Sequence, residues 1–213
     1  MIAAVLFDVD GTLLDAREFI FQAFEHVFTM HHLPAVARQQ LALISGKPLE
    51  ECYRLLAPQL DTALLCQEHR MFQEQHFNLL QPFPHTVVTL QQLQARGIAT
   101  AAITNRRQSG VQSLAHTGVL DYLTVVITGD DVTKLKPDPE GLFKALEVLQ
   151  VAPTAAAMVG DTDADILAGK RAGIKTIGVT YGFFAAADLQ AAAPDVVVDD
   201  IADIIAVVTK HLT

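Results

Sequence analysis

Six short apolar runs recur along the chain, each about as long as a buried strand. They are residues 3–7, 98–103, 123–127, 155–159, 176–179 and 196–198. Segments with helical spacing separate most of these runs, and in one of them Leu142, Leu146 and Leu149 share a face. Strands that alternate with helices predict right-handed crossovers and a parallel sheet covered on both sides. The pattern therefore predicts a doubly wound, Rossmann-like α/β fold.

One long interval interrupts this alternation. From about Asp15 to Gln81 the sequence contains no convincing strand, only helical spacing such as that of Ile20, Phe24 and Val27. The breaker Pro82-Phe83-Pro84 then ends the helical pattern. We expect an all-helical cap domain, residues 15–81, inserted into an α/β core domain formed by residues 1–14 and 82–213.

Charge and composition narrow the classes of function. The formal net charge is −9 at pH 7 and no basic, aromatic-interleaved stripe offsets it, which argues against nucleic acid as a partner. The apolar runs are far shorter than the roughly 20 residues that span a bilayer, and no basic segment precedes the first run as in a signal peptide. The two cysteines form no C-x-x-C pair. We expect a cytoplasmic protein with free thiols and no membrane partner.

Polar residues directly follow four of the predicted strands, where ligands bind in a doubly wound sheet. The four groups are Asp8-Val9-Asp10-Gly11-Thr12, Thr104-Asn105, the segment from Lys134 to Asp138, and Gly160-Asp161-Thr162-Asp163-Ala164-Asp165.

The residue types in these groups favour phosphate chemistry assisted by a metal. Asp8 and Asp10 place like charges close together, and a divalent cation would relieve their repulsion. Asp161 adds a third carboxylate, the hard oxygen ligand that Mg²⁺ prefers. Thr104 and Lys136 supply a hydroxyl donor and a cation for phosphate oxygens. We therefore expect Mg²⁺ and a phosphorylated small molecule to meet at this edge of the sheet.

In this order the four groups resemble the signatures of the haloacid dehalogenase (HAD)-like superfamily of phosphatases, in its capped, phosphoglycolate phosphatase-like branch. The third group matches through Lys136-Pro137-Asp138-Pro139, and the resemblance covers essentially the whole chain. It implies a magnesium-dependent phosphatase acting on a small phosphorylated metabolite, phosphoglycolate-like or a sugar phosphate. The sequence leaves open whether the protein is a monomer or a homodimer.

The resemblance also implies roles for individual residues. Asp8 would form an aspartyl-phosphate, while Asp10 would protonate the leaving oxygen and later activate water. Asp8, Asp161 and the backbone carbonyl of Asp10 would bind the metal. Asp165 would support Lys136 or a metal-bound water.

A second set of implied roles concerns phosphate binding. The side chains of Thr104 and Lys136 would stabilise the transferred phosphoryl group. Backbone N–H groups of the segment ending at Gly11, and of Asn105, would add donors.

Three residues keep two interpretations each. Arg106 is either a solvated arginine at a helix start or a contact for a substrate carboxylate or second phosphate. Lys47 lies in a cap loop that either closes over the site or only turns the chain between helices. His85 stands where related sequences commonly carry glycine, and its ring would narrow the pocket or contact substrate.

Other functions compete with hydrolysis of a phosphomonoester. Hydrolysis of inorganic pyrophosphate is supported by the sequence almost as well as hydrolysis of a phosphomonoester. A sugar phosphomutase would also keep both aspartates, but it needs a cap that excludes water, and basic residues are sparse in the predicted cap. The dehalogenase branch is disfavoured by Asp10, because halide departure needs no acid. A non-enzymatic binding module is disfavoured because Asp8, Asp10, Lys136 and Asp161 are all present.

Overall fold

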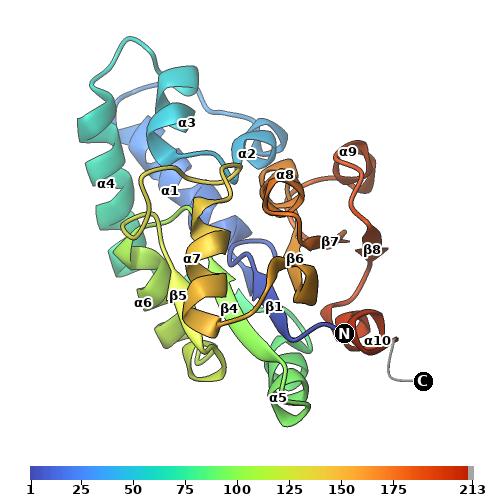
Figure 1. Cartoon of the computed structure of the whole chain (residues 1–213). Coiled ribbons are helices and arrows are strands. Elements are labelled where there is room, and N and C mark those ends of the chain that lie inside the picture. The colour runs from blue at the N-terminus through green and yellow to red at the C-terminus, as the bar shows by residue number, and fades with distance from the viewer. Residues whose placement is uncertain (211–213) are drawn as a thin grey trace.

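A six-stranded parallel sheet lies at the centre of the computed structural model, which describes residues 1–210 (Figure 1). Its strand order is β5-β4-β1-β6-β7-β8. The strands are β1 (Ala4–Phe7), β4 (Ala99–Ile103), β5 (Val125–Ile127), β6 (Ala156–Gly160), β7 (Lys175–Val179) and β8 (Val196–Val198). Each of the six predicted runs forms one of these strands, so the predicted doubly wound α/β fold is confirmed.

Helices cover both faces of the sheet because alternate residues of each strand point to opposite sides. Val5 and Phe7 belong to a hydrophobic cluster with side chains of α5 (Thr86–Ala95), α6 (Gln108–His116) and α10 (Ile204–Thr209). Ala4 and Leu6 belong to a second cluster with α7 (Glu140–Leu149) and α8 (Asp163–Ala172). The remaining short elements are η2 (Leu120–Tyr122), η3 (Pro153–Ala155), α9 (Ala186–Ala191) and η4 (Ile201–Asp203). Within residues 1–210 no helix has the length and apolarity needed to cross a membrane.

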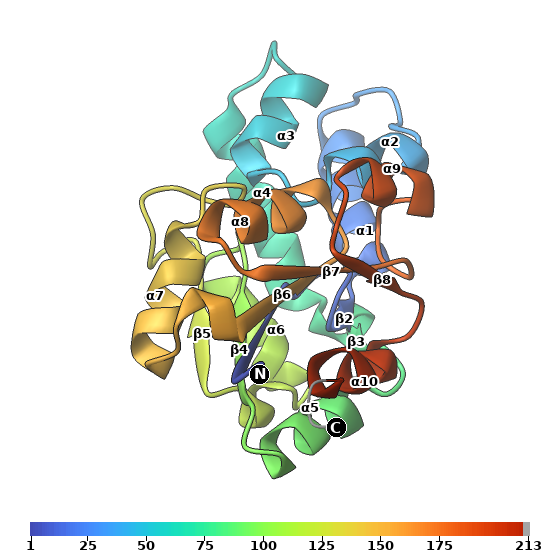
Figure 2. The same ribbon diagram turned by 45° about the vertical axis from the view of Figure 1, so that its right-hand side comes forward.

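Four consecutive helices form the inserted cap and lie together above the sheet in both views (Figures 1 and 2). They are α1 (Arg17–Met30), α2 (Arg38–Ile44), α3 (Leu49–Leu56) and α4 (Thr62–Gln75), followed by η1 (Phe77–Leu79). Their apolar faces form a third cluster, which includes Phe24, Tyr53 and Leu65 and is largely separate from the clusters of the sheet. On this basis we propose residues 15–81 as the cap domain and residues 1–14 and 82–213 as the core domain.

A short antiparallel ribbon connects the cap to the core. Its strands are β2 (Leu14–Asp15) and β3 (Gln81–Pro82), with Leu14 opposite Pro82. The expectation of no strand up to Gln81, with a breaker at Pro82, is wrong at this point. Two-residue strands paired across the whole cap leave no periodic pattern in the sequence, and proline is tolerated in an edge strand.

The register of the sheet places the candidate residues side by side. Phe7, the last residue of β1, lies opposite Ala102 of β4 and Val159 of β6. The residues that follow these strands therefore emerge at one edge. The connections diverge on either side of β1, and such a switch point is where open α/β sheets bind ligands.

Candidate active site

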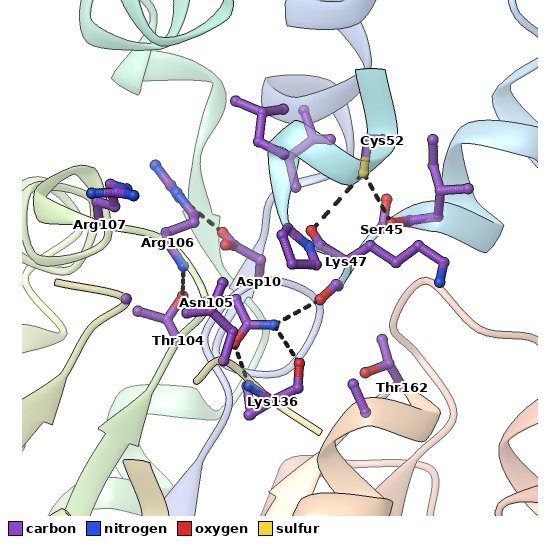
Figure 3. Close-up of a pocket in the computed structure, with 18 of the residues that line it drawn as sticks. Asp10, Ser45, Lys47, Cys52, Thr104, Asn105, Arg106, Arg107, Lys136 and Thr162 are labelled. Atoms are coloured by element: carbon purple, nitrogen blue, oxygen red, sulfur yellow. Dashed lines mark hydrogen bonds and ion pairs between the residues drawn. The ribbon is translucent and has the colours of Figure 1, made fainter. Parts of the chain in front are cut away.

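A cavity of about 140 Å³ lies where the cap meets this edge of the sheet. One water-sized group needs roughly 10–15 Å³ on this measure, so the cavity exceeds the needs of a single phosphoryl group. Loops of the core line one side, and Figure 3 shows their side chains facing the cap loop that contains Lys47. The cap side is formed by residues of α1, α3 and α4 and by the loop between α2 and α3.

Asp8 has one anchored carboxylate oxygen and one free one. Its Oδ1 accepts a hydrogen bond from Lys136 Nζ at 2.5 Å. The same ammonium donates to the carbonyl of Ile103 at 2.8 Å and to Asp165 Oδ1 at 2.7 Å, which fixes its position. Asp8 Oδ2 has no hydrogen-bond partner within residues 1–210, and Asp8 lines the cavity. An oriented carboxylate with a free oxygen is the arrangement that a nucleophile requires.

Three buried carboxylates gather around this position. Asp8, Asp161 and Asp165 each offer an oxygen, and these oxygens lie within 4.8 Å of one another. Lys136 is the one cation paired with this group in the described residues. Three carboxylates and one ammonium leave a formal charge of −2. An oxygen-only donor set with this excess charge suits a hard divalent cation.

Burial accounts for the titration behaviour of Asp161. Its burial raises the pKa to about 7, and the charge of Asp165 acts in the same direction. The N–H of Phe183, which donates to Oδ2 at 2.7 Å, and the hydroxyl of Thr12, which donates to Oδ1 at 3.0 Å, act against the rise. These two donors orient the carboxylate. A bound cation would favour its ionised form.

The buried ion pair at Asp8 shows opposing effects. Burial raises the pKa of Asp8 well above its usual value and outweighs the charge of Lys136, while the neighbouring carboxylates raise it further. Burial alone would lower the pKa of Lys136, but the charges of Asp165 and Asp8 raise it above its ordinary value. Lys136 therefore remains an ammonium, and the carboxylates around it still lack positive charge.

Gly11 permits the close packing of the first loop against Asp161. Its φ is +94°, a region that favours glycine, and a Cβ there would lie 2.3 Å from Asp161 Oδ2. The N–H of Gly11 donates to the carbonyl of Leu14 at 2.8 Å. The sequence predicted that this N–H donates to phosphate, but in this structure it donates within the turn.

Asp10 is paired with Arg106. Arg106 Nη1 donates to Asp10 Oδ1 at 3.0 Å, and the guanidinium carbon lies 4.9 Å from the centre of the Phe19 ring. The Arg106 side chain is only 15% exposed. The interpretation of a solvated arginine at a helix start is therefore wrong. α6 begins at Gln108, and the Thr104 hydroxyl accepts the N–H of Arg106 at 3.1 Å, which turns the loop back across the cavity.

Asn105 joins its own loop to two other backbone segments at the edge of the cavity (Figure 3). Its side-chain amide donates to the carbonyl of Gly46 in the cap at 2.9 Å and to the carbonyl of Lys136 at 3.1 Å. Its Oδ1 accepts the N–H of Lys136 at 2.9 Å. Thr104, directly before it, is buried and lines the same cavity.

Comparison with known protein families identifies the family of this chain. Residues 5–179 match the family model described as haloacid dehalogenase-like hydrolase. The chain belongs to this family. Two relatives named pyrophosphatase PpaX are similar over nearly their whole length. The relative from Oceanobacillus iheyensis is 33% identical, with 97% of each chain covered, and that from Bacillus mycoides is 32% identical, with 98% of each covered.

Solved structures agree with this assignment. A haloacid dehalogenase-like protein from Bacteroides fragilis superposes with a TM-score of 0.90 at 28% identity, covering 96% of this chain and 100% of its own. A structure described as a predicted phosphoglycolate phosphatase, from Haemophilus somnus, has a TM-score of 0.87 at 22% identity, covering 97% of each chain, and shows the fold alone. The resemblance seen in the sequence is confirmed for the family and its capped branch.

The structure of this hydrolase brings most of the predicted site residues together. Those that line the cavity are Asp8, Asp10, Thr104, Asn105, Lys136 and Asp165. Asp161 lies behind them, with an oxygen close to those of Asp8 and Asp165. Asp165 also accepts from the N–H and hydroxyl of Thr162, which caps α8. The chemical roles of these residues stay predictions.

Lys47 lies in the loop that covers the core loops of the hydrolase. Gly46 in this loop has a φ of +96°, and a Cβ there would lie 3.2 Å from Thr162 of the core. Together with the Asn105 contact, this places the loop over the cavity. Lys47 Nζ donates to Glu51 Oε1 at 3.0 Å, so its charge is paired within the cap.

His85 lies outside the cavity. Its ring pairs with Asp200 at 2.8 Å and is not among the cavity-lining residues, so the expected narrowing of the pocket or contact with substrate is wrong. The backbone of His85 has a φ of 66°. This left-handed conformation favours glycine.

His69 is a buried polar residue of the hydrolase that sequence reasoning missed. It is 2% exposed, its Nδ1 lies 3.0 Å from the hydroxyl of Tyr53, and its ring meets the Phe24 ring edge-on at 4.7 Å. Burial lowers the pKa of His69 to about 3, and the charges of Arg106 and Arg70 act in the same direction. The ring is therefore neutral. Its signal in the sequence was a polar side chain on the buried face of α4.

The neutral state of His69 predicts a specific pH dependence of stability. At pH 5 the unfolded chain binds a proton at this ring, whose ordinary pKa is about 6.5, while the folded chain does not. The unfolded state then binds more protons, so stability falls as the pH is lowered from about 7.5 to 5. We expect His69→Leu to remove about 2 kcal/mol of that fall. Urea unfolding of both proteins at both pH values measures it.

The matched control is Cys66→Ala, a buried residue of the same helix that does not line the cavity. It should keep the pH dependence of the wild type. Equal pH dependence in wild type and His69→Leu would show that the ring is protonated in the folded state.

Proposed function

We propose that this hydrolase is a magnesium-dependent phosphatase that acts on a small phosphorylated metabolite through an aspartyl-phosphate on Asp8. The observation that carries the proposal is the state of Asp8, whose Oδ1 is anchored by Lys136 while its Oδ2 is free at the cavity. The names of the relatives, pyrophosphatase and phosphoglycolate phosphatase, support phosphate ester or anhydride chemistry.

The proposed reaction has two steps. Asp8 Oδ2 attacks phosphorus and the bond to the leaving oxygen breaks, while Asp10 gives that oxygen a proton. Asp10 then removes a proton from water, which attacks the phosphoryl group and releases phosphate and Asp8. Lys136 and Thr104 would stabilise the charge on the phosphoryl oxygens in both steps. Arg106 holds the carboxylate of Asp10 beside the cavity.

The carboxylate cluster supports Mg²⁺ as the cofactor. Asp8 and Asp161, with the backbone carbonyl of Asp10, would hold the ion. Its chemistry would be to neutralise the negative charge shared by Asp8 and the phosphoryl group. Asp165 is committed to Lys136 and Thr162, so we assign it the support of the lysine rather than a ligand position.

Two substrate classes are candidates for the proposed reaction. A phosphomonoester, phosphoglycolate-like or a sugar phosphate, is the first candidate. Inorganic pyrophosphate is the second, because the curated relatives at 32–33% identity carry the name pyrophosphatase.

Phosphate release from phosphoglycolate, sugar phosphates, nucleotides and pyrophosphate, with Mg²⁺ and with chelator, tests this function. We expect release from at least one compound with Mg²⁺ and none with chelator. Asp161→Ala should need at least about 10-fold more Mg²⁺ for half-maximal rate, since metal sites lose 10–100-fold in affinity when even supporting groups are removed. The control is Asp163→Ala, at the exposed first residue of α8, and it should keep the wild-type requirement. Folded protein without any release, or release equal in chelator, would refute the proposal.

A further inference from the structure

Every cation that borders the cavity is already paired with a carboxylate. On the cap side, Lys47 pairs with Glu51 and Arg70 pairs with Glu50 at 2.6 Å. On the core side the paired cations are Arg106, Arg107 and Lys136, with Asp10, Asp130 and Asp8. A second charged phosphoryl group in the cap part of the cavity would have to share one of these cations with the carboxylate that already binds it, and that carboxylate would repel the group. The cap part is therefore poorly suited to a charged leaving group.

Two neutral polar side chains in the cap, in contrast, have free groups. Gln73 lies one turn after His69 on α4, and it is 5% exposed. Neither its amide nor His69 Nε2 has a hydrogen-bond partner within residues 1–210. Arg106 Nε is the one fully enclosed side-chain nitrogen or oxygen without a partner in that range, so the free groups of His69 and Gln73 keep some accessible surface. Both residues line the cavity, which is where that surface opens.

The hydrogen bond to Tyr53 determines which ring nitrogen of His69 carries the proton. The Tyr53 hydroxyl is fully buried, and His69 Nδ1 is its only partner in the described part of the chain. If Nδ1 carried the proton, the hydroxyl proton of Tyr53 would have no acceptor, which buried hydroxyl groups rarely tolerate. Hydrogen-bond satisfaction therefore assigns the hydroxyl as donor to Nδ1 and leaves the proton of His69 on Nε2, as a donor facing the cavity.

Aromatic rings hold this donor rigidly, and part of the surrounding cap wall is apolar. The His69 ring is packed against Phe24 and Tyr53, with ring centres 4.7 and 5.8 Å apart. Other cap residues that line the cavity, among them Ile20 and Leu49, have hydrocarbon side chains. Apolar walls with a few fixed polar groups are the usual composition of a small-molecule site.

We propose that His69 and Gln73 form a specificity subsite that hydrogen-bonds an uncharged, oxygen-bearing leaving group, with Tyr53 as the positioning residue. This rests on the proposed phosphatase function and narrows it. The hydrolase prefers phosphomonoesters of hydroxylated or carbonyl-bearing small molecules to pyrophosphate and to esters of acids. We therefore do not expect pyrophosphate, the substrate in the names of the relatives, to be the preferred substrate of this chain.

Two substrates with the same carbon chain test the subsite. Glycerol 3-phosphate and propyl phosphate have leaving groups of the same carbon length, and only the first bears hydroxyls. We expect the wild type to favour glycerol 3-phosphate in kcat/KM, and His69→Leu and Gln73→Leu each to lower that preference about fivefold to tenfold, the effect of one neutral hydrogen bond. Because the ratio is taken within one variant, loss of folded protein cancels, and either variant suffices if the other is unstable. Tyr53→Phe should lower the preference less, and the control Cys66→Ala should not change it.

The outcomes separate the subsite from the proposed function. A wild type that favours pyrophosphate, or one without preference for the hydroxylated ester, overturns the subsite and leaves the phosphatase intact. Equal losses on both esters in His69→Leu and Gln73→Leu also overturn it, since a structural role alone would produce them. Absence of release from every substrate with Mg²⁺ overturns the phosphatase itself.

Discussion

Asp8→Asn is expected to lower phosphate release by at least about 10⁴-fold, because removing the nucleophile of a covalent mechanism removes nearly all catalysis. The amide keeps the size of the carboxylate but offers no anionic oxygen to attack phosphorus. Steady-state release with Mg²⁺ measures the loss. Acid-quenched wild type should carry one phosphoryl group on the peptide that contains Asp8, and the variant should carry none.

The fold of Asp8→Asn should remain intact. Burial raises the pKa of Asp8 by more than the charge of Lys136 lowers it, and the neighbouring carboxylates raise it further, so a neutral amide removes an unfavourable charge in the metal-free protein. Urea unfolding with chelator should give a free energy of unfolding at least equal to that of the wild type. Asp163→Asn, at the exposed first residue of α8, controls for the loss of one negative charge. A near-normal rate in Asp8→Asn would exclude the covalent scheme.

The four central strands, β1, β4, β6 and β7, could be predicted from the sequence because they are buried on both faces. The runs that became β1 and β6 are continuously apolar, and such runs at regular distances leave few alternatives to a parallel sheet. The ribbon of Leu14 and Pro82 could not be read in this way. Its two strands depend on a pairing across the cap, and no local pattern encodes it.

The gathering of Asp8, Asp161 and Lys136 also follows from the sequence. Each comes after a strand of one parallel sheet, and the carboxyl ends of such strands share an edge. The surroundings of Arg106 and His69 did not follow. Arg106 is largely shielded from solvent because Phe19 of the cap lies against it, and His69 borders the cavity because α4 docks over the core. Both depend on how two parts of the chain pack together, which neither part shows by itself.

This division assigns the chemistry and the specificity to different parts of the hydrolase. The groups proposed for phosphoryl transfer lie on loops that follow rigid strands of the core. The groups proposed to select the leaving group lie on α4 of the cap. Asn105 links the two, because its one side chain bonds the carbonyl of Gly46 in the cap and the backbone N–H of Lys136 in the core.

Lys136→Met is expected to destabilise the metal-free protein by about 3–5 kcal/mol, the usual cost of removing one partner from a buried ion pair. Lys136 is the shared partner of Asp8 and Asp165, and its side chain is only 5% exposed. Methionine fills similar space but leaves both carboxylates without their cation. Urea unfolding at about pH 7.5 with chelator measures the change. Lys134→Met, at a side chain that is 72% exposed, should stay within about 0.5 kcal/mol of the wild type.

The pH dependence of Lys136→Met distinguishes a loss of charge from a loss of packing. The charge of Lys136 lowers the pKa of Asp8, so its removal raises that pKa further above the value in the unfolded chain. The folded variant then binds a proton that the unfolded chain does not, and its stability rises as the pH falls through the folded pKa. The deficit relative to wild type should therefore shrink between about pH 7.5 and pH 5. A deficit of constant size would mean that the methylene groups of Lys136, and not its charge, stabilise this part of the core.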